Sequence, residues 1–168
     1  TLPPGPEGGR YPRATSDIVA LLMHDHQVHV HNVLCTANQE ARIALSRWPA
    51  MRELLQLPAD SPPAGSCLVV LNSQAEKILE ALLCKGEAAY PAEGVQGDGA
   101  FERAYAASRR ADGQGRSLRD LDLRTRLLKY RCSPLIYART FEAMPKELRV
   151  VVLRRLSAGL LAANPPPE

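Results

Sequence analysis

The sequence has few aromatic residues, no long apolar run and no concentrated charge of either sign. Aromatic residues make up 5% of the 168 residues, so Leu, Ala and Val must fill the interior, which favours packed helices over a β-sandwich. No stretch approaches twenty uninterrupted apolar residues, and we therefore expect no transmembrane segment. The net charge of +3 comes from 21 basic and 18 acidic residues spread along the chain. A nucleic-acid-binding domain normally has a concentrated basic face, so we expect no nucleic-acid partner.

Common catalytic and cofactor motifs are also missing. The chain has no C-x-x-C-H haem attachment site, no G-x-S-x-G, no phosphate-binding glycine loop and no strand–helix alternation of a nucleotide-binding fold. Its four cysteines, Cys35, Cys67, Cys84 and Cys132, are too widely spaced for a zinc site of their own. Two alternatives remain for these cysteines: they are buried free thiols, or they form one or two disulfides. We therefore favour a non-catalytic protein.

Proline and glycine divide the chain into segments. Residues 1–14 are rich in both and predict an extended N-terminal arm, while residues 164–168 predict a short tail. Between them, residues 15–163 are expected to form a single all-α domain, an irregular bundle of four to five helices. Residues 86–116 predict a long Gly-rich loop of the kind that is often functional. The chain begins with Thr1, so we expect a processed exported protein or a part of a longer one.

The first long helix is predicted from Ile18 to Arg47. Thr15 or Ser16 is expected to cap it, and Trp48-Pro49 to end it, because the residue before a proline is pushed out of the α region. Further helical segments are predicted at 51–57, at 67–86 with a stop at Gly86, at 100–107, at 115–130, in a short piece up to 143, and at 145–163.

The helix predicted at 115–130 depends mainly on charge patterns. Ser117 and Asp120 resemble a capping box, and Asp120 with Arg124 and Asp122 with Arg126 are opposite charges four residues apart. On a helix, each of these pairs would be stabilising.

All four histidines fall within eight residues, at His24, His26, His29 and His31. At about 100° per helical residue, the first and last point nearly the same way, and the middle two point roughly opposite. Apolar residues surround the whole helix, so we expect it to be buried on most sides, with some imidazoles in the interior or at an interface.

Three interpretations of these histidines stay open. They can be hydrogen-bonded core, interface or surface residues with no ligand. They can coordinate or contact a haem, because imidazole binds iron and the neighbouring Val and Leu suit a porphyrin. Finally, His26 with His29, or His24 with Asp25, can bind zinc or copper together with ligands from elsewhere.

Two stretches carry a family resemblance: SDIVALLMHDHQVHVHN with the following TANQEAR, and GRSLRDLDLRTRLLKYRCSPLIYARTFEAMP. Together they resemble the C-terminal region of uncharacterised exported bacterial proteins that often carry c-type cytochrome-like segments upstream. The group's first motif falls here on His26, His31 and Asn32. Its later motif falls on Arg116, Ser117, Asp120, Asp122, Arg126, Cys132 and Tyr137. This chain has RCSPLIY where the group more often has PCSYLIY.

The resemblance implies a helical module in the periplasm, or otherwise exported, in the company of haem proteins. Our main hypothesis is a non-catalytic subunit or domain that docks onto a protein partner in a haem-containing redox assembly, through its N-terminal arm and residues 86–116. The haem would be non-covalent or held by the partner. The rival hypothesis is a small haem- or metal-binding redox protein that uses His26 and His31 with Cys35 or Asp25.

Overall fold

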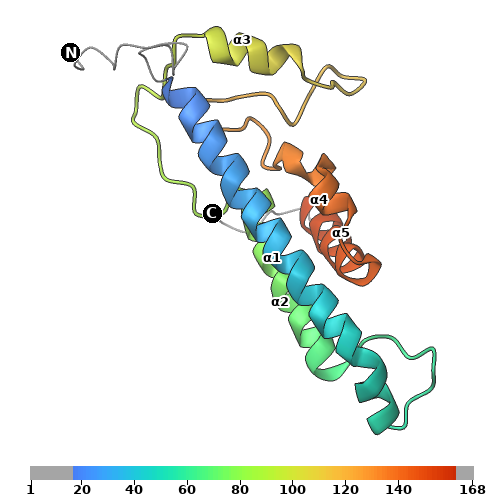
Figure 1. Ribbon diagram of the computed structural model, residues 1–168. Helices are drawn as coiled ribbons and strands as arrows, with labels where there is room; N and C mark the ends of the chain where they lie inside the picture. The colour runs from blue at the N-terminus through green and yellow to red at the C-terminus, as the bar shows by residue number, and fades with distance from the viewer. Residues whose placement is uncertain (1–16, 162–168) are drawn as a thin grey trace, which may run out of the picture. The chain divides into compact units, whose positions relative to one another are not determined.

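The computed structural model describes residues 17–161, and in this range the chain is helical with no β-strand (Figure 1). The predicted all-α class is confirmed. The predicted arm at 1–14 and tail at 164–168 lie outside the described residues, as do Thr15 and Ser16. None of the helices in this range is both long and apolar enough to cross a lipid bilayer. The elements are α1 (Ile18–Leu54), α2 (Gly65–Leu82), α3 (Ala100–Ala107), the 3₁₀-helix η1 (Pro134–Tyr137), α4 (Arg139–Glu142) and α5 (Lys146–Leu161).

Helix α1 continues through Pro49 to Leu54, so the end predicted at Arg47 is wrong. A proline inside a helix costs about 3 kcal/mol because it removes one backbone hydrogen bond and crowds the preceding turn. A tertiary contact holds the chain in place here: the Trp48 side chain is 6% exposed, and its indole N–H donates to the carbonyl oxygen of Ser61 at 3.3 Å. The packing of Trp48 thus outweighs the tendency of Pro49 to end the helix.

The separate helix predicted at 51–57 is also wrong, because its first residues complete α1. The chain leaves the helix at Gln56, whose φ of 53° is left-handed, and the Leu57 N–H donates to the Arg52 carbonyl at 3.1 Å. Helix α2 ends at Leu82, and Cys84 just beyond it is likewise left-handed (φ 54°), two residues before the glycine predicted to stop the helix.

Residues 115–130 form turns, so the helix predicted there is wrong. An antiparallel bridge joins Leu121 to Leu128, and the Leu123 N–H donates to the Arg126 carbonyl at 2.8 Å across the tip of the turn. The N–H of Val95, from the preceding loop, donates to the Leu123 carbonyl at 2.7 Å. The backbone hydrogen bonds of this segment therefore run across the turn and to the preceding loop.

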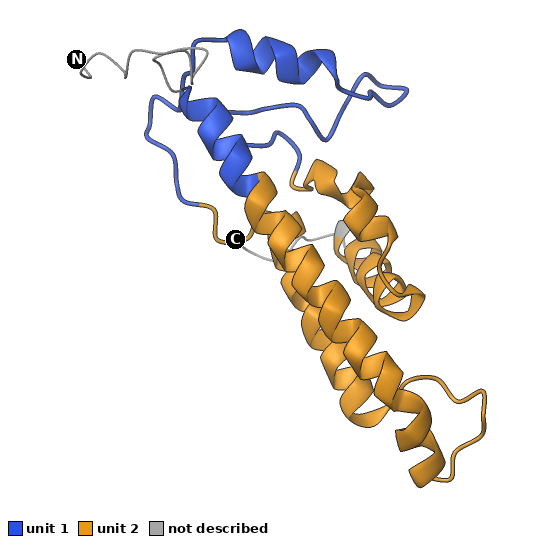
Figure 2. Cartoon of the chain, in the orientation of Figure 1, with its two compact units in different colours: residues 1–26, 88–130 blue, residues 27–87, 131–168 orange. Residues whose placement is uncertain are grey.

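The chain divides into two compact units (Figure 2). Unit 1 contains the chain up to His26 together with Ala88–Tyr130, and unit 2 contains Gln27–Glu87 and the chain from Arg131 onward. Helix α1 thus contributes its first turns to unit 1 and its remainder to unit 2. The single domain predicted over 15–163 stays a prediction.

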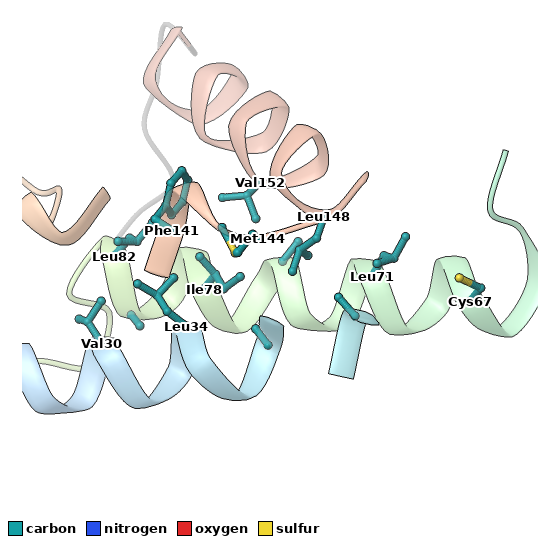
Figure 3. Packing of buried hydrophobic residues seen from close by; sticks show 14 of the residues in the cluster. Val30, Leu34, Cys67, Leu71, Ile78, Leu82, Phe141, Met144, Leu148 and Val152 are labelled. Carbon is teal, nitrogen blue, oxygen red and sulfur yellow. The ribbon is translucent and has the colours of Figure 1, made fainter. Parts of the chain in front are cut away.

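Unit 2 has a continuous hydrophobic core (Figure 3). Leu34 of α1, Ile78 of α2 and Leu148 of α5 are fully buried in it. Burying an aliphatic side chain of this size contributes about 1.5–3 kcal/mol. The buried members of this cluster are Val30, Leu34, Ala37, Ala41, Trp48, Cys67, Leu71, Ala75, Ile78, Ala81, Leu82, Phe141, Met144, Leu148 and Val152.

Unit 1 contains α3 and the irregular loops around it. Its buried apolar side chains are Val19, Met23, Tyr105, Leu127 and Leu128. Since this set is small, hydrogen bonds between loop backbone and side chains carry much of the organisation of unit 1.

Candidate functional site

The four histidines lie on α1 as predicted, but most of them face solvent. His24, His29 and His31 are exposed, and His26 is half-buried. Three of the four imidazoles therefore do not lie in the interior of this chain, and the alternative expectation, that some of them lie at an interface with a partner, stays a prediction.

The histidines are exposed because α1 packs against the rest of the chain on one side only. Val30 and Leu34 face the core, whereas Leu21 and Val28 are 53% and 43% exposed. The prediction that α1 is buried on most sides is wrong, because the other elements of the chain cover one side of it. Apolar side chains on the opposite side stay in contact with water.

His31 and Cys35 are in direct contact on this exposed side. Their spacing of four residues places the side chains on adjacent turns, and the Cys35 Sγ lies 3.4 Å from the His31 Nε2. Cys35 is a free thiol and is exposed. The contact joins a soft sulfur ligand and an imidazole nitrogen, the two ligand types that zinc binds most often.

The exposed side of α1 around this pair carries no Asp, Glu, Lys or Arg from residue 27 to residue 39, although 23% of the whole sequence is charged. We call this surface the neutral face. Its exposed residues are Val28, His29, His31, Asn32, Cys35, Thr36 and Gln39.

A small pocket lies between α1 and α2, with a volume of about 230 Å³. Sites for drug-sized ligands and cofactors usually measure about 300–1,000 Å³. This pocket is therefore smaller than such sites, and apolar atoms contribute most of its surface. The lining residues are His29, Asn32, Val33, Thr36, Gln74 and Lys77.

In the later motif, Ser117 and Asp120 form the predicted contact without a helix. The Ser117 N–H donates to Asp120 Oδ2 at 3.0 Å, which closes a turn. The pairing predicted between Asp120 and Arg124 is replaced by an ion pair with Arg109, whose Nε lies 3.1 Å from Asp120 Oδ1. The motif residue Ser117 is buried, so this part of the motif has a structural role in holding the loop.

The other motif residues are divided between the two units. Asp122 accepts a hydrogen bond from Thr125, which lowers the pKa of the Asp122 carboxyl, and Arg126 Nε lies 3.8 Å away. These residues belong to unit 1, whereas Cys132 and Tyr137 belong to unit 2. Burial raises the pKa of the Cys132 thiol, and the Tyr137 side chain is 75% exposed. No catalytic group is assembled by the motif residues within either unit.

A cluster of three carboxylates, absent from the sequence-based predictions, lies in unit 1. One oxygen from each of Asp17, Asp98 and Glu102 lies within 4.8 Å of the others, and Glu102 Oε2 is buried with no hydrogen-bond partner. Carboxylate oxygens are ligands for Ca²⁺ and Mg²⁺. The only sequence signal for this cluster is the Gly-Asp-Gly loop at residues 97–99, which lacks the alternating acidic ligands of a calcium loop.

Asp17 already has a structural role in this cluster. Its Oδ1 accepts the N–H groups of Val19 at 2.8 Å and Ala20 at 3.0 Å, which caps α1, and its Oδ2 accepts the Asp98 N–H at 3.0 Å. The N–H donors of Ala20 and then Asp98 lower the pKa of the Asp17 carboxyl. Asp17 thereby joins the start of α1 to the loop before α3.

Comparison with protein families, curated proteins and solved structures finds no match to this chain. The resemblance to the cytochrome-associated group therefore stays a hypothesis.

Proposed function

We propose that this chain is a non-catalytic helical module that docks onto a protein partner in an exported, haem-containing redox assembly. The exported and haem-related setting comes from the sequence resemblance alone. The docking role is supported by an observation on unit 2, the concentration of exposed apolar side chains at one end of α1 and α2.

This end, which we call the hairpin tip, consists of the last turn of α1, the following loop and the start of α2 up to Val69 (Figure 1). It holds six of the twelve large apolar side chains that are exposed among the described residues. Exposed apolar groups gathered in this way mark interaction surfaces, whereas isolated ones are ordinary. The six are Met51, Leu54, Leu55, Leu57, Leu68 and Val69.

The hairpin tip is a further candidate contact surface beside the N-terminal arm and residues 86–116, for which inter-subunit contacts stay a prediction. Residues 86–116, predicted to make inter-subunit contacts, hold none of the exposed large apolar side chains of the described chain. Leu54 and Val69 are 78% and 67% exposed, so their side chains gain little from folding and are available for burial by a partner.

The test is a comparison of two variants of the immobilised chain in a periplasmic extract. The double variant Leu54→Glu/Val69→Glu places two charges on the hairpin tip, and Leu153→Glu places one on α5, where Leu153 is 43% exposed. We expect the parent chain and Leu153→Glu to retain the same haem-containing protein, detected by its Soret absorption, and the double variant to retain at least tenfold less. Equal retention by the double variant, or retention of only haem-free protein, would overturn the proposal.

A second candidate function is metal or haem binding by the histidine segment of a small redox protein. The observation that favours it is the exposed contact of Cys35 with His31, in which the Sγ and Nε2 atoms are 3.4 Å apart. An optical spectrum and metal analysis of the purified chain test it, and the absence of both a Soret band and bound metal would contradict it.

A further inference from the structure

His31 and Cys35 have the spacing of two ligands of one metal ion. In tetrahedral zinc sites the Zn–S and Zn–N bonds are about 2.3 Å and 2.0 Å, so neighbouring sulfur and nitrogen ligands lie about 3.5 Å apart. The Cys35 Sγ and the His31 Nε2 are 3.4 Å apart on consecutive turns of α1. The two atoms are therefore already separated by the distance expected of two ligands of one ion.

No third ligand from the described part of this chain joins the pair. Among residues 17–161, the one group of three or more His, Cys, Asp or Glu whose ligand atoms converge is Asp17, Asp98 and Glu102, which excludes both residues of the pair. All histidines and cysteines of the sequence lie in this range, so residues 1–16 and 162–168 contain no further imidazole or thiol. Two ligands make half of a tetrahedral site.

We propose that two copies of this chain share one divalent ion of the zinc type, bound by His31 and Cys35 of each copy. A two-fold symmetric dimer presents the same pair twice and so completes a Cys₂His₂ set. Each Cys35 thiol releases its proton to water when its sulfur binds the ion, and the two thiolates balance the charge of the ion. The inference rests on the metal-binding candidate function and adds the ligands and the second copy.

The neutral face suits contact with a copy of itself. A two-fold dimer brings each residue near its own equivalent, so a charged face would place like charges together. The exposed residues of this face carry no Asp, Glu, Lys or Arg, and Val28, one turn before His31, is 43% exposed. The ion would thus be bound within an uncharged and partly apolar contact, where its bonds to thiolate sulfur face little competition from water.

The test uses the full, untagged chain with its thiols reduced, titrated with Co²⁺ as a spectroscopic substitute for Zn²⁺. We expect thiolate-to-cobalt charge-transfer absorption that saturates at one Co²⁺ per two chains. The molecular mass measured by sedimentation should double, with the same dependence on Co²⁺ as the absorption. Zn²⁺ should displace the cobalt, and a chelator should restore the monomer.

Variants identify the ligands. Cys35→Ala and His31→Gln should each abolish the metal-dependent dimer, and because both residues are exposed, circular dichroism should show an unchanged helix content. His29→Gln is the matched control, since His29 is another exposed imidazole of the neutral face but takes no part in the contact of His31 with Cys35. It should leave the stoichiometry and the dimer unchanged.

The outcomes separate this inference from the function on which it rests. One Co²⁺ per monomeric chain, lost in Cys35→Ala, would overturn the shared site and leave metal binding in place. Charge-transfer absorption that is absent, or unchanged in Cys35→Ala, would overturn metal binding by this pair altogether. A dimer that persists with the chelator would overturn the role of the ion in holding two copies together.

Discussion

Unit 1 and unit 2 are stabilised by different kinds of interaction. In unit 2, side chains from four α-helices bury one hydrophobic cluster. In unit 1, carboxylates bind backbone N–H groups at turns: Asp17 caps α1, and Asp112 Oδ1 accepts the N–H groups of Gln114 and Arg116, each at 2.9 Å. Hydrophobic burial depends little on pH, whereas a hydrogen bond to a carboxylate requires the ionised form. The two units should therefore respond differently to the same perturbation.

The largest expected effect is the loss of a core side chain in unit 2. Leu34 is fully buried in the cluster, and Leu34→Ala should lower the free energy of unfolding by about 2–5 kcal/mol. Urea denaturation followed by circular dichroism measures this change. Leu153→Ala is the control, because Leu153 is 43% exposed and its loss should change the free energy by less than about 0.5 kcal/mol. Equal effects of the two substitutions would contradict the core assigned to unit 2.

A smaller effect, confined to unit 1, is expected from Gly94→Ala. Gly94 has a φ of 79°, and a Cβ atom there would lie 2.6 Å from the carbonyl oxygen of Leu123. The strain should destabilise the folded loop by about 1–3 kcal/mol, and it should separate the loop around Gly94 from the turn at Leu123. Hydrogen exchange should then become faster at Val95 and Leu123 and remain unchanged in α2. Gly113→Ala is the matched control, since a Cβ at residue 113 meets no atom within 4 Å, and loss of protection by this variant would count against the proposed strain.

The third prediction concerns acid, which should weaken unit 1 before unit 2. Hydrogen bonds lower the pKa of the carboxyls of Asp17, Asp112 and Asp122, and all three belong to unit 1. A carboxyl with a lowered pKa in the folded state stabilises the fold above its unfolded value, and this stabilisation is lost as the pH falls through the folded value. As the pH falls from about 4 through the lowered folded values, amide protection corrected for intrinsic exchange should therefore fall first in unit 1.

Asp17→Asn is the control for the acid prediction. Asparagine also caps helices, so the variant keeps the acceptor for the first turn of α1 and removes the titrating charge. The pH dependence of protection at Val19 and Ala20 should become weaker in this variant. Earlier loss of protection in unit 2 than in unit 1 would contradict the prediction.

Hydrophobic periodicity predicted the elements of the fold that bury an apolar face. Helix α3 was predicted with its observed bounds, and α2 and α5 nearly so, since local pattern and packing agree there. The segment 115–130 was mispredicted because a Ser-x-x-Asp pattern and opposite charges four residues apart also fit a tight turn. Whether this segment forms a helix or a turn depends on contacts with distant residues, such as Val95 with Leu123 and Arg109 with Asp120. The local sequence does not indicate these contacts.

The candidate sites, too, were predictable from local sequence only in part. The pairing of His31 with Cys35 follows from helical spacing, whereas the exposure of both depends on which side of α1 the other elements cover. The carboxylates of Asp17 and Asp98 converge over a long separation in the sequence, so no motif indicates their contact. The hairpin tip was missed because its leucines were assigned to a separate helix before α2.

The contact of Trp48 with Ser61 that carries α1 past Pro49 has an optical consequence. The sequence contains a single tryptophan, and its ring is buried in unit 2. Indole emission should therefore shift to the red only when that unit opens and admits solvent to the ring. Unfolding confined to unit 1 would leave the tryptophan emission unchanged. Intrinsic fluorescence therefore distinguishes the unfolding of the two units without an added label.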